Sequence, residues 1–268
     1  MRIALYQGPA GPNQLAQNLA RLERWATEAA LRGVDLVVFP EMFLSGYNIG
    51  AQAAQALAHA PDGEAPAQVA EIARRNSIAI AYGYPEAGPA GAVYNAAQLV
   101  DGHGQRLIDY RKAHLFGDLD RAMFSAGDGG FPVATLNGWK LGLLICYDVE
   151  FPEAVRHLAL SGAELVLVPT ANMAGFELVA EVTVRARAYE NGCYLAYANY
   201  CGEEAGLRYC GLSSLCGPAG EQLAIAGVEE ALLIADLDRQ HLRATRQATP
   251  YLADRRNDLY GRHGPQSN

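Results

Sequence analysis

The spacing of apolar and polar positions along this chain predicts an α/β protein. Two near-continuous apolar runs, VDLVVF at 34–39 and LVLV at 165–168, have the length of strands and no polar alternation. Such runs favour strands that are buried on both faces of a helix-covered sheet. Residues 13–31 differ, because their leucines recur every three to four positions. That spacing predicts an amphipathic helix between two strands.

The same patterns predict further elements along the rest of the chain. Proline is tolerated in the first turn of a helix, so the helix after the strand at 139–145 is expected to begin at Pro152. Strands are expected at 2–7, 78–84, 93–100, 106–111, 194–199, 213–216, 222–226 and 231–236, and helices at 65–76, 152–160 and 178–191. No composition break or internal repeat interrupts the series. We therefore expect one α/β domain over residues 1–268, with a polar C-terminal tail at 251–268.

Composition and charge narrow the range of functions. Half of the 268 residues are hydrophobic, and the formal net charge is −8 without any run of basic residues. These values favour a protein with a sizeable core and argue against nucleic-acid binding. No apolar stretch is long enough to span a membrane, and Met1 is not followed by a signal core. The sequence therefore predicts a cytoplasmic protein that does not insert into membranes.

The cysteine spacing and the motifs of the chain argue against three further features: a disulfide framework, a zinc site and a bound cofactor. The number of cysteines is odd, and no pair has CxxC spacing, so neither a disulfide framework nor a zinc site is expected. No phosphate-binding loop or dinucleotide fingerprint occurs, so no cofactor is expected. Four of the cysteines are expected to be small buried residues: Cys193, Cys201, Cys210 and Cys216.

Three residues with reactive side chains each follow a predicted buried strand. Glu41 lies in FPEMFLSGY, Lys112 in YRKAHLFG and Cys146 in LGLLICYDVEFPE. The ends of strands are where open α/β folds place their sites. A carboxylate, an ammonium and a thiol are together the groups needed to attack a carbonyl carbon through sulfur.

Cys146 needs both a sharp turn and a base to act as a nucleophile. It lies between a strand and the helix expected at Pro152. A turn there would expose the sulfur and direct the backbone N–H of Tyr147 at a developing oxyanion. The base could be Glu41, or a histidine such as His114 or His157. Taken alone, each of these residues would more often be structural or solvated, and only their combination favours catalysis.

The three motifs, taken in this order, resemble the signatures of the nitrilase superfamily of carbon–nitrogen hydrolases over essentially the whole chain. The resemblance implies that Glu41 is the general base, Lys112 the oxyanion stabiliser and Cys146 the nucleophile. It also implies a four-layer α-β-β-α sandwich. Members of this superfamily pair through their outer helices, so a homodimer or a higher homo-oligomer is expected.

Many members carry a fourth acidic residue, usually glutamate, before a Phe-x-Pro-Gly-like segment. In the matching segment, DLDRAMFSAGD, Asp120 occupies that position and Ala126 replaces the common proline. The resemblance implies that Asp120 positions the substrate or Lys112. Aspartate is shorter by one methylene, and Asp118 is a second candidate for the role.

Longer stretches, including PEMFLSGYNIG and YRKAHLFGDLDRAMFS, are similar to the 5-aminopentanamidases of this superfamily. The similarity implies hydrolysis of a small aliphatic amide with a terminal ammonium, and release of ammonia. Four side chains are candidates for binding that tail, because cations need acidic or aromatic partners: Asp118, Asp120, Glu150 and Tyr147. Other interpretations stay open: an ω-amidase, an N-carbamoylputrescine amidase, a catalytically silent binding protein, or a Cys–His protease.

Overall fold

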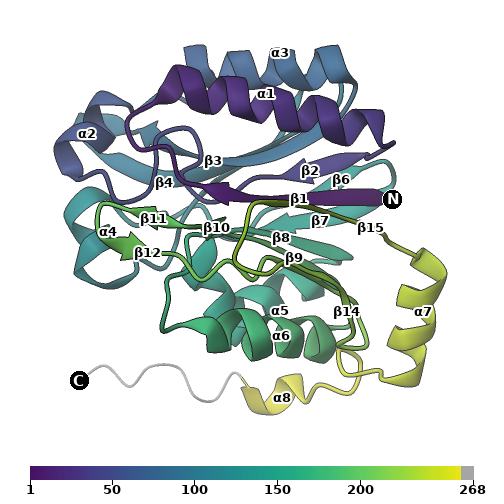
Figure 1. The fold of residues 1–268 in the computed structure, drawn as a ribbon. Helices are drawn as coiled ribbons and strands as arrows, with labels where there is room; N and C mark the ends of the chain where they lie inside the picture. Colours follow the sequence, from purple (N-terminus) through teal and green to yellow (C-terminus); the bar gives the residue numbers. More distant parts are fainter. Residues whose placement is uncertain (261–268) are drawn as a thin grey trace, which may run out of the picture.

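Two β-sheets packed face to face form the centre of the molecule, and helices cover their outer faces (Figure 1). The structure is a computed structural model that describes residues 1–260. Its layers follow the order helix, sheet, sheet, helix. This arrangement confirms the α-β-β-α sandwich implied by the sequence motifs.

The first sheet has seven strands in the order β10-β1-β2-β3-β4-β5, with β15 also paired to β1. Strands β1, β2 and β3 run parallel, whereas β4, β5 and β15 are antiparallel to their neighbours. Helices α1 (Leu15–Leu31) and α3 (Glu64–Asn76) cover its outer face (Figure 1). The strands are β1 (Arg2–Pro9), β2 (Leu36–Val38), β3 (Ala79–Ala87), β4 (Val93–Val100), β5 (Arg106–Arg111), β10 (Tyr200–Cys201) and β15 (Ala231–Asp236).

The second sheet has six strands in the order β14-β13-β9-β8-β7-β6, with β7, β8 and β9 parallel. Its outer face is covered by α5 (Pro152–Leu160) and α6 (Val184–Asn191) (Figure 1). The strands are β6 (Val133–Leu136), β7 (Trp139–Leu143), β8 (Leu165–Pro169), β9 (Tyr194–Ala198), β13 (Ser214–Cys216) and β14 (Gln222–Ile225).

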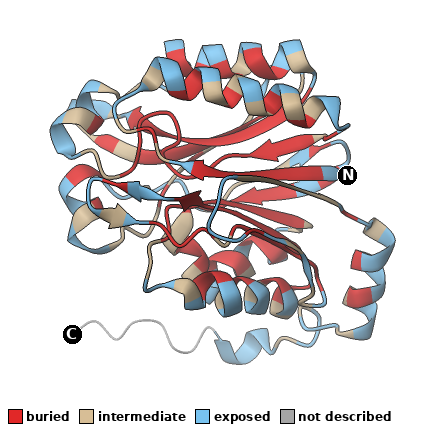
Figure 2. Ribbon diagram, viewed as in Figure 1, coloured by how far each residue is buried: buried red, intermediate tan, exposed pale blue. Residues whose placement is uncertain are grey.

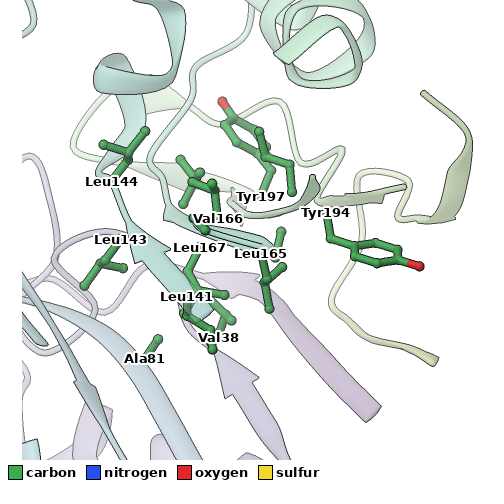
Figure 3. Close-up of a cluster of buried hydrophobic side chains, with 14 of the residues drawn as sticks. Val38, Ala81, Leu141, Leu143, Leu144, Leu165, Val166, Leu167, Tyr194 and Tyr197 are labelled. Carbon is green, nitrogen blue, oxygen red and sulfur yellow. The ribbon is translucent and has the colours of Figure 1, made fainter. Parts of the chain in front are cut away.

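The apolar core fills the space between the sheets and the spaces under the helices. Figure 2 shows that burial concentrates on the strands, whereas the helices are exposed on their outer sides. Leu141 and Leu167 of the second sheet face Val38 and Ala81 of the first (Figure 3). Val37, next to Val38, belongs instead to the cluster under α1 and α3. Strand β2 is thus buried on both faces, as its unbroken apolar run predicted.

Most predicted elements are confirmed within a few residues, and the differences have local causes. The strand predicted at 139–145 ends at Leu143, and a 3₁₀ helix, η2, occupies Cys146–Glu150. The helix predicted at 178–191 begins with a π-helical turn, η3 (Val179–Thr183). The four cysteines expected to be buried are buried and form no disulfide among the described residues.

Several short or polar elements were not predicted. Helix α7 (Arg239–Ala248) contains one leucine, Leu242, and so lacks an apolar stripe in the sequence. The other elements absent from the prediction are α2 (Ala51–Ala56), η1 (Pro89–Gly91), α4 (Gly117–Met123), β6, β10, and the strands β11 (Glu203–Glu204) and β12 (Leu207–Arg208), which form a small hairpin.

The predicted tail at 251–268 is described in part. It contains α8 (Asn257–Tyr260), and 261–268 lie outside the described residues. Within residues 1–260, no helix has both the length and the apolarity needed to cross a bilayer.

Candidate active site

The fold brings the ends of strands from both sheets together around Glu41, Lys112 and Cys146. Glu41 follows β2 and Lys112 follows β5 in the first sheet, whereas Cys146 follows β7 in the second. The Glu41 N–H donates to the carbonyl of Thr170, which follows β8, at 3.3 Å. At Gly83 of β3, an added Cβ would lie 2.2 Å from the backbone nitrogen of Met42. Glycine at this position therefore lets the Glu41 turn pack directly on the sheet.

Lys112 is buried between two carboxylates. Its Nζ lies 2.8 Å from Oε1 of Glu41 and 2.7 Å from Oδ2 of Asp120. Burial opposes the charge on this ammonium, but the two carboxylates outweigh it and hold the pKa of Lys112 well above its usual value. Because an ammonium has three N–H donors and two are engaged, one remains for a further acceptor.

The two carboxylate oxygens of Glu41 have different surroundings. Oε1 accepts hydrogen bonds from Lys112 Nζ and, at 2.6 Å, from Nδ2 of Asn95. Oε2 is buried and has no hydrogen-bond partner among residues 1–260. Burial raises the pKa of Glu41, and the charge of Asp120 adds to this effect against the lowering influence of Lys112 and Asn95. A buried carboxylate with a raised pKa and an unengaged oxygen suits proton transfer.

Cys146 begins the 3₁₀ helix in a strained conformation. Its φ is 46°, in the left-handed region that residues other than glycine seldom adopt. Cys146 is partly exposed, unlike the other four cysteines. Tyr147 precedes the first hydrogen bond of the turn, from Asp148 N–H to the Ile145 carbonyl, so the Tyr147 N–H is not used within the helix. The predicted sharp turn at the sulfur is confirmed.

The surroundings of the Cys146 sulfur oppose its ionisation. Burial and the negative charge of Glu41 raise its pKa, against the opposing effects of Lys112 and of a hydrogen bond from the Ala171 backbone. Glu41 and Lys112 form an ion pair and both charges act on this sulfur, so Cys146 lies near that pair. A thiol with a raised pKa must lose its proton during the attack, which requires a base next to it.

The structure distinguishes between the two aspartates of α4. Asp120 is fully buried and binds Lys112, the hydroxyl of Tyr47 at 2.8 Å and the N–H of Phe116 at 2.9 Å. Asp118 lies two residues earlier and is exposed. Of these two aspartates, Asp120 is therefore the one that contacts Lys112, despite a side chain shorter than that of glutamate.

The histidines do not take the place of Glu41. Nδ1 of His114 lies 2.7 Å from Oδ1 of Asp148, and its ring stacks on Phe151 at 3.9 Å between centroids. His157 packs near Phe131, with the ring centroids 5.6 Å apart. The ring of His114 is thus bound to a buried carboxylate instead of the sulfur, so the geometry does not support a Cys–His pair.

Glu150 and Tyr147, the remaining predicted binding residues, lie on η2 together with Cys146. The Glu150 carboxylate is half-buried and forms no hydrogen bond or ion pair within the described part of the chain. Burial raises its pKa, against the lowering effect of the nearby charges of Lys112 and Arg187. The ring of Tyr147 meets that of Phe116 edge to face at 5.3 Å, and Phe116 likewise meets Phe176 at 5.5 Å.

Sequence reasoning missed three residues of this site. Asn95 contacts Glu41, Tyr47 contacts Asp120, and Asp148 binds His114 and the Ile145 N–H. For Asn95 a signal was present, because it is a polar residue within the largely apolar strand VYNAAQLV. Buried polar groups need partners, so such a residue marks a polar contact inside the fold.

Comparisons with known proteins agree with this geometry. Residues 2–247 match the family model described as carbon-nitrogen hydrolase. The chain belongs to the carbon–nitrogen hydrolase family. The superfamily inferred from the three motifs is thereby confirmed.

Individual relatives are similar over almost the whole chain. A Pseudomonas protegens protein named "Hydrolase in pqqF 5'region" is 58% identical, covering 97% of this chain and 90% of its own. An (R)-stereoselective amidase from Pseudomonas sp. is 38% identical, covering 97% and 93%. The NitN amidase of Nesterenkonia sp. AN1 superposes with a TM-score of 0.84 at 40% identity, covering 97% of this chain and 98% of its own.

Structures of the Nesterenkonia amidase include chemical evidence for that protein. One variant shows Michael addition of acrylamide at its active-site cysteine, and another is in complex with butyramide. This carbon–nitrogen hydrolase is accordingly an amidase of the nitrilase superfamily, acting on C–N bonds other than peptide bonds.

Proposed function

We propose that this amidase hydrolyses a small aliphatic amide through a thioester on Cys146, and that its substrate is 5-aminopentanamide, which yields 5-aminopentanoate and ammonia. One observation carries the catalytic part. The thiol of Cys146, a residue with strained backbone, lies near a buried Glu41–Lys112 pair, and the second oxygen of Glu41 is unengaged.

In the first half of the reaction, Sγ of Cys146 attacks the amide carbonyl while Oε2 of Glu41 takes the thiol proton. The third N–H of Lys112 and the N–H of Tyr147 stabilise the negative charge on the carbonyl oxygen. Glu41 then gives its proton to the amide nitrogen, the C–N bond breaks and ammonia leaves. An acyl group remains on the sulfur.

In the second half, Glu41 takes a proton from a water molecule as that water attacks the thioester carbonyl. The C–S bond breaks, the sulfur recovers the proton, and the carboxylic acid is released. Glu41 thus takes part in four proton transfers, and one positioned group of this kind contributes roughly 10²–10⁴-fold to a rate.

Glu150 is the best candidate for the partner of the substrate ammonium. Asp120 is committed to Lys112 and Tyr47, and Asp118 is exposed on α4. Glu150 offers a half-buried carboxylate with no partner among residues 1–260, within reach of the charge of Lys112. A cationic tail would satisfy that carboxylate, because a partly buried charge is costly unless it is paired.

The substrate assignment is tested by kinetics on matched amides. For wild type, kcat/KM for 5-aminopentanamide should exceed that for pentanamide, N-carbamoylputrescine and succinamate. Glu150→Gln should raise KM for 5-aminopentanamide at least tenfold and leave KM for pentanamide nearly unchanged, since one partly buried charge pair is removed. Glu153→Gln, an exposed change three residues away, is the control. A preference for the carbamoyl or the anionic substrate would refute the assignment.

We also propose that the amidase forms a homodimer or a higher homo-oligomer through its outer helices. Large apolar side chains are exposed on or just before η3 and α6: Leu178 is 67% exposed, Val182 53% and Tyr189 40%. Clustered apolar residues on a surface are typical of protein interfaces. Light scattering should give a mass of at least two chains, and Val182→Glu should lower it. A monomeric wild type would contradict the proposal.

A further inference from the structure

Asn95 of β4 contacts both members of the buried Glu41–Lys112 pair. Its Nδ2 donates to Oε1 of Glu41 at 2.6 Å, and its backbone carbonyl accepts from the Lys112 N–H at 2.8 Å. Asn95 is itself 1% exposed. A buried amide inside a largely apolar strand is costly unless it is hydrogen-bonded, so its presence here needs a reason.

The contact matters because of the oxygen that receives it. Asn95 and Lys112 both donate to Oε1, and none of the residues 1–260 donates to Oε2. Two donors on one oxygen stop the carboxylate from rotating. The other oxygen stays without a partner, although an unpaired buried acceptor costs about 1–3 kcal/mol. The arrangement therefore reserves one oxygen for a group that the resting protein lacks.

We propose that Asn95 is a positioning residue: it pins Oε1 of Glu41 together with Lys112, so that Oε2 is presented to the thiol and to the substrate nitrogen. This inference rests on the proposed role of Glu41 as the base. It assigns the proton transfers to Oε2 and gives Asn95 no contact with the reacting atoms.

The neutral amide suits this role better than a charged group. The ammonium of Lys112 already opposes the charge of Glu41, and a second cation would weaken the base further. An aspartate at position 95 would place a second carboxyl where the amide now donates at 2.6 Å. Two carboxyls at that distance share one proton. An amide donates a hydrogen bond and adds no net charge.

The decisive readout is the pH profile, because loss of packing alone does not move it. Asn95→Leu removes the donor at similar volume. A donor to the ionised form lowers the pKa of a carboxyl, as Asn95 does for Glu41, so its loss raises that pKa. In the pH profile of kcat/KM, the acid limb, where activity rises with pH, should move to higher pH by about one unit. We also expect kcat to fall at least tenfold, with KM changed less than threefold.

Gln98→Leu is the matched control. Gln98 is a buried amide on the same strand, but its Nε2 donates to the Pro61 carbonyl and the Tyr84 hydroxyl, away from Glu41. It should lose a comparable amount of stability and keep the wild-type acid limb. An Asn95→Leu acid limb that stays at the wild-type pH would overturn the inference.

Two further variants keep the outcomes separable. If Asn95→Leu does not fold, Asn95→Asp decides, because a shared proton should move its acid limb upward as well, and an unmoved limb would refute the role. Glu41→Gln is measured in parallel. Turnover by Glu41→Gln at the wild-type rate would refute the proposed function. If Glu41→Gln is inactive but the Asn95 variants keep the wild-type acid limb of kcat/KM, only the role of Asn95 is refuted.

Discussion

Replacing Asp120 with asparagine should move the acid limb of the amidase reaction to lower pH. Asp120 accepts from Lys112 and Phe116 through Oδ2 and from Tyr47 through Oδ1. An asparagine can keep this geometry, with its oxygen toward Lys112, because the hydroxyl of Tyr47 can accept as well as donate. The substitution therefore removes one negative charge and keeps the hydrogen bonds of this side chain.

The size of the effect follows from the distances at Lys112. Oε1 of Glu41 and Oδ2 of Asp120 bind the same Nζ at 2.8 and 2.7 Å, so they lie at most about 5.5 Å apart. At an effective dielectric constant of about 20, two like charges at that distance repel by about 3 kcal/mol, or about two pKa units. The charge of Asp120 raises the pKa of Glu41, and its removal must lower that pKa.

The assay is ammonia release as a function of pH. The acid limb of kcat/KM reports the base of the free enzyme, and for Asp120→Asn it should move down by between about one and two units. The plateau should fall roughly tenfold, because a base with a lower pKa accepts a proton less readily. Asp118→Asn, exposed on the same helix, should leave the profile unchanged. An acid limb that moves upward in Asp120→Asn would refute the reasoning.

Three other changes test the site and the core. Cys146→Ala should abolish amide hydrolysis and leave the melting temperature within a few degrees of wild type; residual turnover near the wild-type rate would exclude the nucleophile. Asp148→Ala strips the acceptor from Tyr110, His114 and Ile145, and should lower the free energy of unfolding in urea by at least about 2 kcal/mol. Leu167→Ala opens a cavity between the sheets and should cost about 2–5 kcal/mol with an unchanged m-value, whereas a cost below 1 kcal/mol would contradict tight packing there.

Much of the site could be predicted because its reactive residues follow strands. Glu41, Lys112 and Cys146 each come just after a predicted strand, and chain direction places such positions at the ends of sheets. Their convergence depends on how the two sheets face each other. No pattern along the chain contains that information, and only the resemblance to a known superfamily supplied it.

Contacts that depend on register or rotation could not be predicted. Asn95 lies next to Glu41 because of the way β4 pairs with β3 and β5. The same pairing lets the Lys112 N–H donate to the Asn95 backbone carbonyl. Asp118 and Asp120 are two residues apart on α4, so their side chains point about 200° apart. The sequence shows both aspartates as equal candidates, and the rotation of the helix decides between them.

Helix α7 could not be predicted from the spacing of its apolar residues. Its buried positions are Leu242 and Thr245, too few for a stripe of helical period. Strand β2, in contrast, has one apolar face under the helices and another between the sheets. Its burial was therefore predictable from six residues alone.

The central claim is a covalent intermediate on Cys146, and mass spectrometry of the acid-quenched reaction tests it most directly. Wild-type protein mixed with 5-aminopentanamide should gain the mass of the acyl group on the peptide that contains Cys146, and Cys146→Ala should gain none. Turnover without any adduct under rapid quenching, or an adduct on a different residue, would contradict the account.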